Sequence, residues 1–380
     1  MTNNHFDVIV VGVGAMGSAA CWELARRGVR VLGLEQFDIP HTRGSSHGYS
    51  RVTRTAYYEH SDYVPLLQRS HILWSELEAE SAEKILHMVG GLYLGPLDGE
   101  LVGGSLRSAR EHGLAHELLD RAAVSKRFPQ FTVPDDWSGL LEPQAGFLLP
   151  ELAISAFVNC ALHRGAEIHG HEEVKAWHAD ASGVTVTTAL RTYRADKLIF
   201  SGGAWSNSLI HDLGVPLTVT RQVLGWVWPK TPAAFKAGTL PVWMIDRLDG
   251  TTYYGFPMVT QSPGLKVAVH APLDRTDPNH VERGILPGDE ETFRSCLRRF
   301  IPQGDGPLLA LRTCLYTNSP DGHFILDRHP RHERVVLAAG FSGHGFKFAS
   351  VIGELLADLA CTGQTRQPIG FLGLERFRKG

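Results

Sequence analysis

The sequence has 380 residues, of which 43% are hydrophobic and 20% are charged, a composition typical of soluble globular proteins. With 37 Lys and Arg residues against 40 Asp and Glu residues, the formal net charge is −3, so there is no electrostatic basis for binding nucleic acid or an anionic membrane surface. The apolar runs are strand-sized and too short to span a membrane, and the length favours two domains.

The N-terminus and the cysteines favour a cytoplasmic protein. The chain begins MTNNHFDVIVVG, without the basic flank and long apolar segment of a signal peptide. The five cysteines are scattered, odd in number and without CxxC spacing, which argues against a disulfide framework or a zinc site. We therefore expect a reducing, cytoplasmic environment.

Residues 6–35 form the first predicted unit, in which two strands flank a glycine-rich loop and a helix. The strand at 7–11 leads into Gly12-x-Gly14-x-x-Gly17, where the glycines permit a tight turn, approach of the backbone to a pyrophosphate and close helix–strand contact, in that order. The helix N-terminus offers free N–H groups to phosphate. Glu35 ends the second strand (29–34), where a carboxylate can accept hydrogen bonds from a ribose diol. The unit predicts a dinucleotide site and leaves FAD and NAD open.

The middle of the chain departs from an NAD-type domain. Residues 36–60 are rich in Gly, Ser, His and Arg and predict an extended loop where another helix would be usual. Helices are predicted over about 63–81 and 151–164, with one or two shorter helices within 101–128. Strands follow between 166 and 201, with a turn at 180–183.

The second half predicts an antiparallel sheet and then a return to the first domain. Strand-like runs separated by Pro and Gly turns extend over 217–270, followed by a helix near 289–300. The strand at 334–339, the glycine-rich loop at 340–345 and the helix at 346–359 repeat the order strand, loop, helix of the N-terminal unit.

Histidine pairs do not form a metal pattern. His112 and His116 lack the glutamate of HExxH, and we expect His329 and His332 to be exposed loop or strand residues. We predict no metal site.

Six segments together resemble one family, the FAD-dependent amine oxidases that include monomeric sarcosine oxidase and N-methyltryptophan oxidase, with pipecolate oxidase a relative. The segments are PHTRGSSHGYSRVTRTAY (40–57), YVPLLQRS (63–70), YYGFP (253–257), GLKVAVH (264–270), TCLYTNSPDGHFILD (313–327) and GFSGHGFKFAS (340–350). The resemblance covers nearly the whole chain.

The fold that this resemblance implies is α/β plus α+β. A discontinuous Rossmann-like FAD-binding domain would comprise residues 1–85, 146–217 and 318–380. A second, catalytic domain containing an antiparallel sheet would comprise residues 86–145 and 218–317.

The resemblance also implies roles for individual residues. Cys314 would carry FAD through a thioether, and Arg54 and Lys347 would hold the substrate carboxylate, for which a guanidinium fork is the preferred partner. Lys266 would lie near flavin N5 and promote reaction with O2, because a fixed cation stabilises superoxide. The other implied contacts with substrate or flavin are those of Arg51, Tyr254, His270, Tyr316, Arg43, Ser45, His47, Gly343, His344 and Gly345, in addition to Gly12, Gly14, Gly17 and Glu35.

The predicted function is oxidation of a small secondary amino acid, a sarcosine-like N-methyl amino acid, to an imine. O2 is reduced to H2O2, and the imine is hydrolysed to an aldehyde and an amine. Alternatives are an oxidase of a cyclic imino acid such as pipecolate or proline, an NAD(P)-linked dehydrogenase, and a flavin-binding protein without turnover. We expect a monomer whose partners are the amino acid and O2.

Two departures from the family pattern leave the substrate open. Tyr49 stands where the family has an acid near the entrance to the active site. The segment 241–252 differs in length and charge from the sarcosine-specific form, and Trp243 and Arg247 within it are expected to reshape the pocket.

Overall fold

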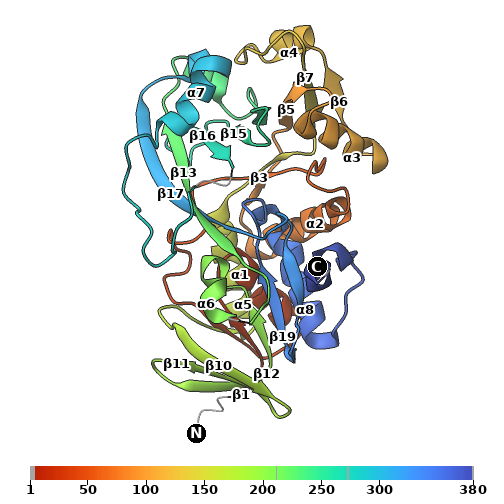
Figure 1. The fold of residues 1–380 in the computed structure, drawn as a ribbon, viewed down its shortest axis with the longest axis vertical. Coiled ribbons are helices and arrows are strands. Elements are labelled where there is room, and N and C mark those ends of the chain that lie inside the picture. Colours follow the sequence, from red (N-terminus) through yellow and green to blue (C-terminus); the bar gives the residue numbers. More distant parts are fainter. Residues whose placement is uncertain (1–4, 211, 272–273, 379–380) are drawn as a thin grey trace.

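The structure is a computed structural model that describes residues 5–210, 212–271 and 274–378. Within these residues the strands form two eight-stranded sheets and one three-stranded sheet. Figure 1 shows the first sheet, with β1 and β12, at the bottom of the view and the second, with β5, β7 and β16, at the top.

The first sheet contains the N-terminal unit. Its strands are β1 (His5–Val11), β2 (Val31–Leu34), β9 (Glu167–His169), β10 (Val174–Asp180), β11 (Gly183–Thr188), β12 (Thr192–Phe200), β18 (Ile325–His329) and β19 (His332–Ala339). The order is β10-β11-β12-β1-β2-β9, and β19 pairs in parallel with β12. Strand β1 pairs in parallel with both β12 and β2, as a Rossmann-like core requires.

Both faces of β1 are buried. Val8 and Val10 face a core shared with helices α1 (Ala15–Arg26), α2 (Tyr63–Ser81), α5 (Pro150–His163) and α8 (Ala349–Thr362), whereas Ile9 and Val11 face a core that includes residues of β10 and β11. A strand that is buried on both faces has a nearly continuous run of apolar residues, and this run allowed the strand at residues 7–11 to be predicted from the sequence.

The second sheet is antiparallel except for one parallel pair, β14 with β5. Its strands are β5 (Gly91–Pro96), β6 (Glu117–Leu119), β7 (Trp137–Glu142), β13 (Thr218–Val227), β14 (Val242–Asp246), β15 (Thr252–Phe256), β16 (Leu265–His270) and β17 (Leu308–Asn318). Helices α3 (Ser105–Glu111), α4 (Arg121–Arg127), α6 (Ser206–Leu209) and α7 (Glu291–Phe300) complete the α-helices of the described residues. The long paired strands β13 and β17 run from the second sheet toward the first (Figure 1). The predicted fold class is confirmed, and the exact domain bounds stay a prediction.

Some predicted elements differ from the structure. The second strand begins at Val31 rather than Val29, because Val29 still donates to Leu24 O (3.0 Å) in the turn that ends α1. The predicted helix at 346–359 is a 3-10 turn (Phe346–Phe348) followed by α8. The small sheet of β3 (Arg51–Thr53), β8 (Gly146–Leu148) and β4 (Leu86–His87) was not predicted, because strands of two or three residues show no alternation.

None of the helices among the described residues has the length and apolar character needed to cross a bilayer.

Candidate functional site

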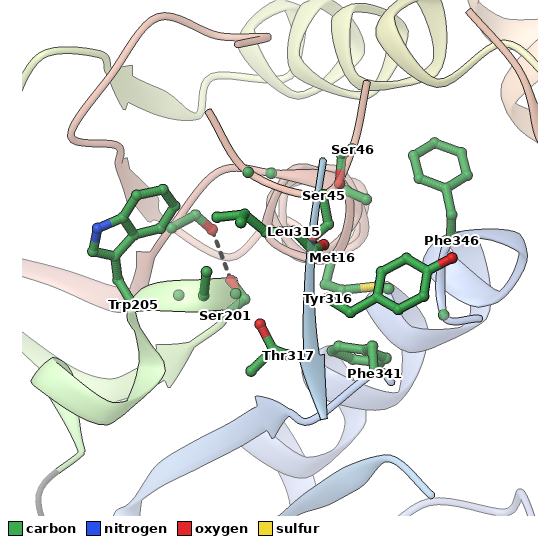
Figure 2. Close-up of a pocket in the computed structure, with 18 of the residues that line it drawn as sticks. Met16, Ser45, Ser46, Ser201, Trp205, Leu315, Tyr316, Thr317, Phe341 and Phe346 are labelled. Carbon is green, nitrogen blue, oxygen red and sulfur yellow. Dashed lines mark hydrogen bonds between the residues drawn. The ribbon is translucent and has the colours of Figure 1, made fainter. Parts of the chain in front are cut away.

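A cavity of about 400 Å³ begins at the carboxyl ends of β1 and β2 and extends to β15, β16 and β17 of the second sheet. Figure 2 shows part of its wall, with Trp205 and Ser201 on one side and Tyr316 and Phe346 on the other. The cavity therefore joins the two sheets and has the elongated form that a dinucleotide needs.

The glycine-rich loop forms the first end of the cavity. Gly12 has φ +88°, and a Cβ on Gly17 would lie 1.8 Å from the Gly12 carbonyl oxygen, so α1 can begin there only if residue 17 has no side chain. A Cβ on Gly14 would meet no atom within 4 Å, and Gly14 lines the cavity. The open space at Gly14 is the place where a phosphate can approach the backbone.

Glu35 lies beside this loop with its carboxylate already oriented. Its Oε2 accepts from Val13 N (2.9 Å) and its Oε1 from Phe37 N (3.1 Å), and burial raises its pKa. Glu35 lines the cavity at the end of β2, where the sequence placed it.

Cys314 lies midway along the cavity, on β17. Its side chain is 1% exposed, and its sulfur is 3.6 Å from Arg51 Nη2 and 3.7 Å from Ser45 O. Arg51 also donates from Nη2 to Ser45 O (2.7 Å) and from Nη1 to Ser50 O (2.9 Å). The structure thus brings Cys314, Arg51 and Ser45 together from segments more than 250 residues apart in the chain.

Lys266 is buried behind the loop that carries Arg51 and does not line the cavity. Its Nζ donates to Gly48 O (2.8 Å) and Ser50 O (2.7 Å) and lies above the ring of Phe256 at 4.6 Å. Burial, together with the Arg51 cation, lowers the pKa of Lys266 well below its usual range. Two backbone carbonyls thus hold its amino group in a dry environment.

Arg54 and Glu59 form a bidentate ion pair at the second end of the cavity. Arg54 Nη2 lies 2.6 Å and 2.5 Å from the two oxygens of Glu59, and Nη1 donates to Ala56 O (3.1 Å). Burial alone would raise the pKa of Glu59, but Arg54, His344 and Lys347 together lower it to about 2. Glu59 was not predicted from the sequence, although it lies five residues from Arg54.

Lys347 begins a chain of hydrogen bonds next to this pair. Its Nζ donates to His344 O (2.7 Å) and to Tyr57 OH (3.4 Å), and the Tyr57 hydroxyl is 2.6 Å from His344 Nδ1. His344 Nε2 lies 3.0 Å from Gly322 O, so Nε2 carries the proton and Nδ1 accepts from Tyr57. Burial lowers the pKa of His344 to about 3 and, with Arg54, that of Lys347 to about 7.

Aromatic side chains form the wall between these cations and Cys314. Tyr254 and Tyr316 line the cavity, and the Tyr316 hydroxyl is 3.4 Å from His270 Nδ1. Burial lowers the pKa of His270 to about 4. A Cβ on Gly343 (φ +81°) would lie 2.3 Å from the Tyr316 ring, so a glycine is required there for the loop to pass this wall.

The structure brings most of the predicted residues to this cavity. Those that line it are Gly12, Gly14, Glu35, Ser45, Arg51, Arg54, Tyr254, His270, Cys314, Tyr316, Gly343, His344, Gly345 and Lys347. Arg43 is exposed above the ring of Phe37 (5.0 Å), and His47 is buried, with neither ring nitrogen bonded to another of the described residues. Of the segment 241–252, Met244 lines the cavity, whereas Trp243 and Arg247 do not.

Two carboxylates, one buried and one partly buried, hold the loop between residues 48 and 56, and sequence reasoning missed both. Glu151 accepts from Gly48 N (2.6 Å) and Tyr49 N (3.2 Å). Glu142 accepts from Thr55 N (2.6 Å) and Ala56 N (3.1 Å) and from the Tyr93 hydroxyl. Nothing local marks them, because their partners lie about 90 to 100 residues earlier in the chain.

Three ligand-type atoms of Asp212, His329 and His332 lie within 4.8 Å of one another, and none of these residues lines the cavity. His329 is 3% exposed, which corrects the expectation of an exposed residue, because its Nδ1 accepts from Arg331 N (3.2 Å) and its Nε2 donates to Asp212 Oδ1 (2.9 Å). The other Asp212 oxygen pairs with Arg331. These bonds account for the group without an ion, and the lack of a metal site stays a prediction.

Known proteins match this chain over almost its whole length. The family model described as "FAD dependent oxidoreductase" matches residues 7–359. The chain is 42% identical to a monomeric sarcosine oxidase of Streptomyces avermitilis over 98% of both chains. It is 37% identical to an N-methyl-L-tryptophan oxidase of Citrobacter koseri over 93% of this chain and 94% of that one. Among solved structures, NikD, an amino acid oxidase essential for nikkomycin biosynthesis, has a TM-score of 0.83 at 27% identity over 97% of both chains. The resemblance inferred from the six sequence segments is confirmed.

Proposed function

This chain belongs to the FAD-dependent oxidoreductase family, and from that premise we propose that it oxidises a small secondary amino acid of the N-methyl, sarcosine-like type. The products would be an imine and H2O2, and hydrolysis of the imine would yield an aldehyde and an amine. The observation that carries the proposal is the pair of buried cations, Arg54 and Lys347, at the far end of a cavity that begins at a dinucleotide loop. Relatives named for N-methyl substrates support the choice of a secondary amine.

FAD fits the residues that line the cavity. Gly14 leaves open space for phosphate, and Glu35 presents a fixed carboxylate. When bound, FAD supplies the two-electron acceptor of the reaction. We infer that Cys314 holds it through a thioether, since its sulfur faces the cavity beside Arg51. Gly343, His344 and Gly345, directly before the 3-10 turn Phe346–Phe348, would lie along the flavin.

Arg54 and Lys347 would bind the substrate carboxylate. A guanidinium offers paired N–H donors to a carboxylate, and the ammonium of Lys347 adds a second charge in a site of low dielectric constant. Since Glu59 already holds Arg54 Nη2, the incoming carboxylate has to displace Glu59 or share the guanidinium with it. Binding would thereby orient the amine toward Tyr254, Tyr316 and His270.

Lys266 would act on the oxygen half of the reaction. Its amino group, when protonated, is a cation held by two backbone carbonyls behind Arg51. A cation fixed before the reaction stabilises developing negative charge on O2 without the cost of reorganisation.

The test is peroxide release from a panel of N-methyl, cyclic and primary amino acids. We expect activity on N-methyl amino acids with stoichiometric aldehyde. Activity on proline or pipecolate without aldehyde would assign the cyclic substrate instead, and equal activity on primary amino acids would refute the secondary-amine assignment. Bleaching of the yellow protein by the substrate under anaerobic conditions separates an enzyme from a flavin-binding protein.

We further propose that the protein is a cytoplasmic monomer. Five unpaired cysteines, four of them buried, support a reducing compartment, and relatives described as monomeric support the oligomeric state. Light scattering of the purified protein at micromolar concentration tests the second point directly.

A further inference from the structure

Residues Gly48, Tyr49 and Ser50 form a tight turn directly before Arg51. The Ser50 N–H donates to Gly48 O at 2.8 Å, and the backbone φ angles are +100° at Gly48 and +68° at Tyr49. Tyr49 is not a glycine, so the left-handed conformation is costly for it and persists only where the surroundings impose it.

Two oppositely charged side chains impose this conformation from opposite sides. Glu151, at the start of α5, accepts from Gly48 N at 2.6 Å and from Tyr49 N at 3.2 and 3.3 Å. Lys266 donates to Gly48 O and Ser50 O, the two carbonyls of the same turn, at 2.8 and 2.7 Å. The N–H groups of Gly48 and Tyr49 therefore meet a carboxylate, and the carbonyls of Gly48 and Ser50 meet the amino group of Lys266.

Neither Glu151 nor the turn at residues 48–50 lines the cavity, but Arg51, which directly follows the turn, does. The turn delivers Arg51, whose guanidinium donates back to Ser50 O and to Ser45 O and reaches the Cys314 sulfur. A Cβ on Gly48 would lie 2.7 Å from Leu224 Cδ1, so β13 leaves no room for a side chain at this position of the turn.

We propose that Glu151 is a positioning residue of the reaction: it holds the turn at residues 48–50 and thereby fixes the ammonium of Lys266 behind Arg51. The kinetic consequence rests on the proposed function, in which Lys266 promotes the reaction with O2. The structural consequence, the ordering of the turn, is independent of that function.

The perturbation is Glu151→Ala, compared with Glu151→Gln. Alanine removes the acceptor, whereas the Gln carbonyl oxygen still accepts from both N–H groups. In Glu151→Ala we expect the rate of flavin reoxidation by O2 to fall by about tenfold to a hundredfold, because small displacements of a catalytic group have effects of this size. Reduction by substrate under anaerobic conditions should change less than twofold, since Arg54 and Lys347 are held by other partners.

Strain at Tyr49 supplies a second test. If Glu151 is needed because a non-glycine residue occupies the left-handed region, then Tyr49→Gly should restore at least part of the reoxidation rate in the Glu151→Ala background. A double variant as slow as Glu151→Ala alone would overturn the proposal.

Hydrogen exchange of the peptide that spans 44–53, measured by mass spectrometry on the purified protein, reports the turn directly. We expect faster exchange in Glu151→Ala than in the wild type and near-normal exchange in Glu151→Gln. Glu354→Ala, which removes a half-buried carboxylate paired with Arg69, is the matched control and should leave this peptide unchanged. Unchanged exchange of the peptide in Glu151→Ala would overturn the proposal. If the wild type proves to carry no flavin and the peptide still exchanges faster in Glu151→Ala, the role of Glu151 in holding the turn stands and the proposed function is refuted.

Discussion

Glu59→Gln is expected to tighten the binding of a small carboxylate such as acetate. In the structure both oxygens of Glu59 lie within 2.6 Å of Arg54 Nη2, the group proposed to receive the substrate carboxylate. An amide in place of this carboxylate retains one acceptor for the guanidinium and removes the competing charge. The ligand would then meet two cations, Arg54 and Lys347, without an internal anion between them.

The size of the effect follows from the pKa of Glu59. A carboxyl group whose pKa falls from 4.5 to about 2 is stabilised in its charged form by about 3 kcal/mol. A neutral amide bonded to the same guanidinium still contributes about 1.5 kcal/mol. The free energy of acetate binding is thus more favourable by about 1.5 kcal/mol in the variant, and we expect the Kd for acetate to fall about tenfold.

Folding stability should change in the opposite direction. Because the pKa of Glu59 is lowered in the folded protein, its stabilisation is present above pH 4.5 and is lost as the pH falls toward about 2. At pH 7 the variant should therefore unfold more easily than the wild type, by about 1.5 kcal/mol, because the amide keeps part of the stabilisation. Tighter binding in a less stable protein is a combination that general damage to the site does not produce.

The assay is titration of the resting protein with acetate at pH 6, followed by the visible flavin spectrum. This pH lies below the value of about 7 for the pKa of Lys347, so the second cation is present. Asp62→Asn, which neutralises an exposed carboxylate at the start of α2, is the control and should leave the Kd unchanged. An unchanged or higher Kd in Glu59→Gln would refute the competition argument.

Three further predictions follow from other parts of the cavity. Gly17→Ala should destabilise the protein by about 1–3 kcal/mol and abolish flavin binding, because its Cβ would lie 1.8 Å from Gly12 O. Gly14→Ala, whose Cβ would meet no protein atom, should keep the thermal midpoint and still lose flavin. Calorimetry and the ratio of flavin to protein absorbance distinguish the two variants. Cys314→Ser should release its flavin into the supernatant after acid precipitation, while the wild-type flavin stays in the pellet; white wild-type pellets would exclude the thioether. In the wild type, the Kd for acetate should rise as the pH passes about 7, because Lys347 loses its proton there, and a constant Kd from pH 6 to 8 would contradict that role.

Contiguous patterns were predictable from the sequence. The strand, the three glycines, the helix and Glu35 lie within 30 residues, and each has a local physical reason for its position. The bounds of α2 match the predicted helix at 63–81, because its apolar residues recur with helical spacing along its whole length. The choice of FAD, by contrast, depended on segments such as 313–327 and 340–350, near the other end of the chain.

The residue that pairs with each charged side chain of the site was not predictable from the sequence. Arg54 and Arg51 were identified as cations suited to an anion, but a sequence does not state which anion the folded protein already supplies. Glu59 is near in the chain and Glu151 is 100 residues from Arg51, yet both became visible only once distances were known. The same applies to Lys347, whose pKa near 7 results from burial and from Arg54, both of which are properties of the folded state.

The loop from residue 44 to 59 explains why the site needs so many distant anchors. It carries the arginines into a cavity, but its only regular structure is the short strand β3, so its own backbone bonds cannot hold them still. Buried charges act on a ligand as fixed charges only when the backbone behind them is fixed as well. Glu142 on β7, Glu151 on α5 and Lys266 on β16 supply that support by occupying the N–H and carbonyl groups that an irregular loop would otherwise leave free. Substitution of Glu142 or Glu151 is therefore expected to alter catalysis through the loop, without any contact to the substrate.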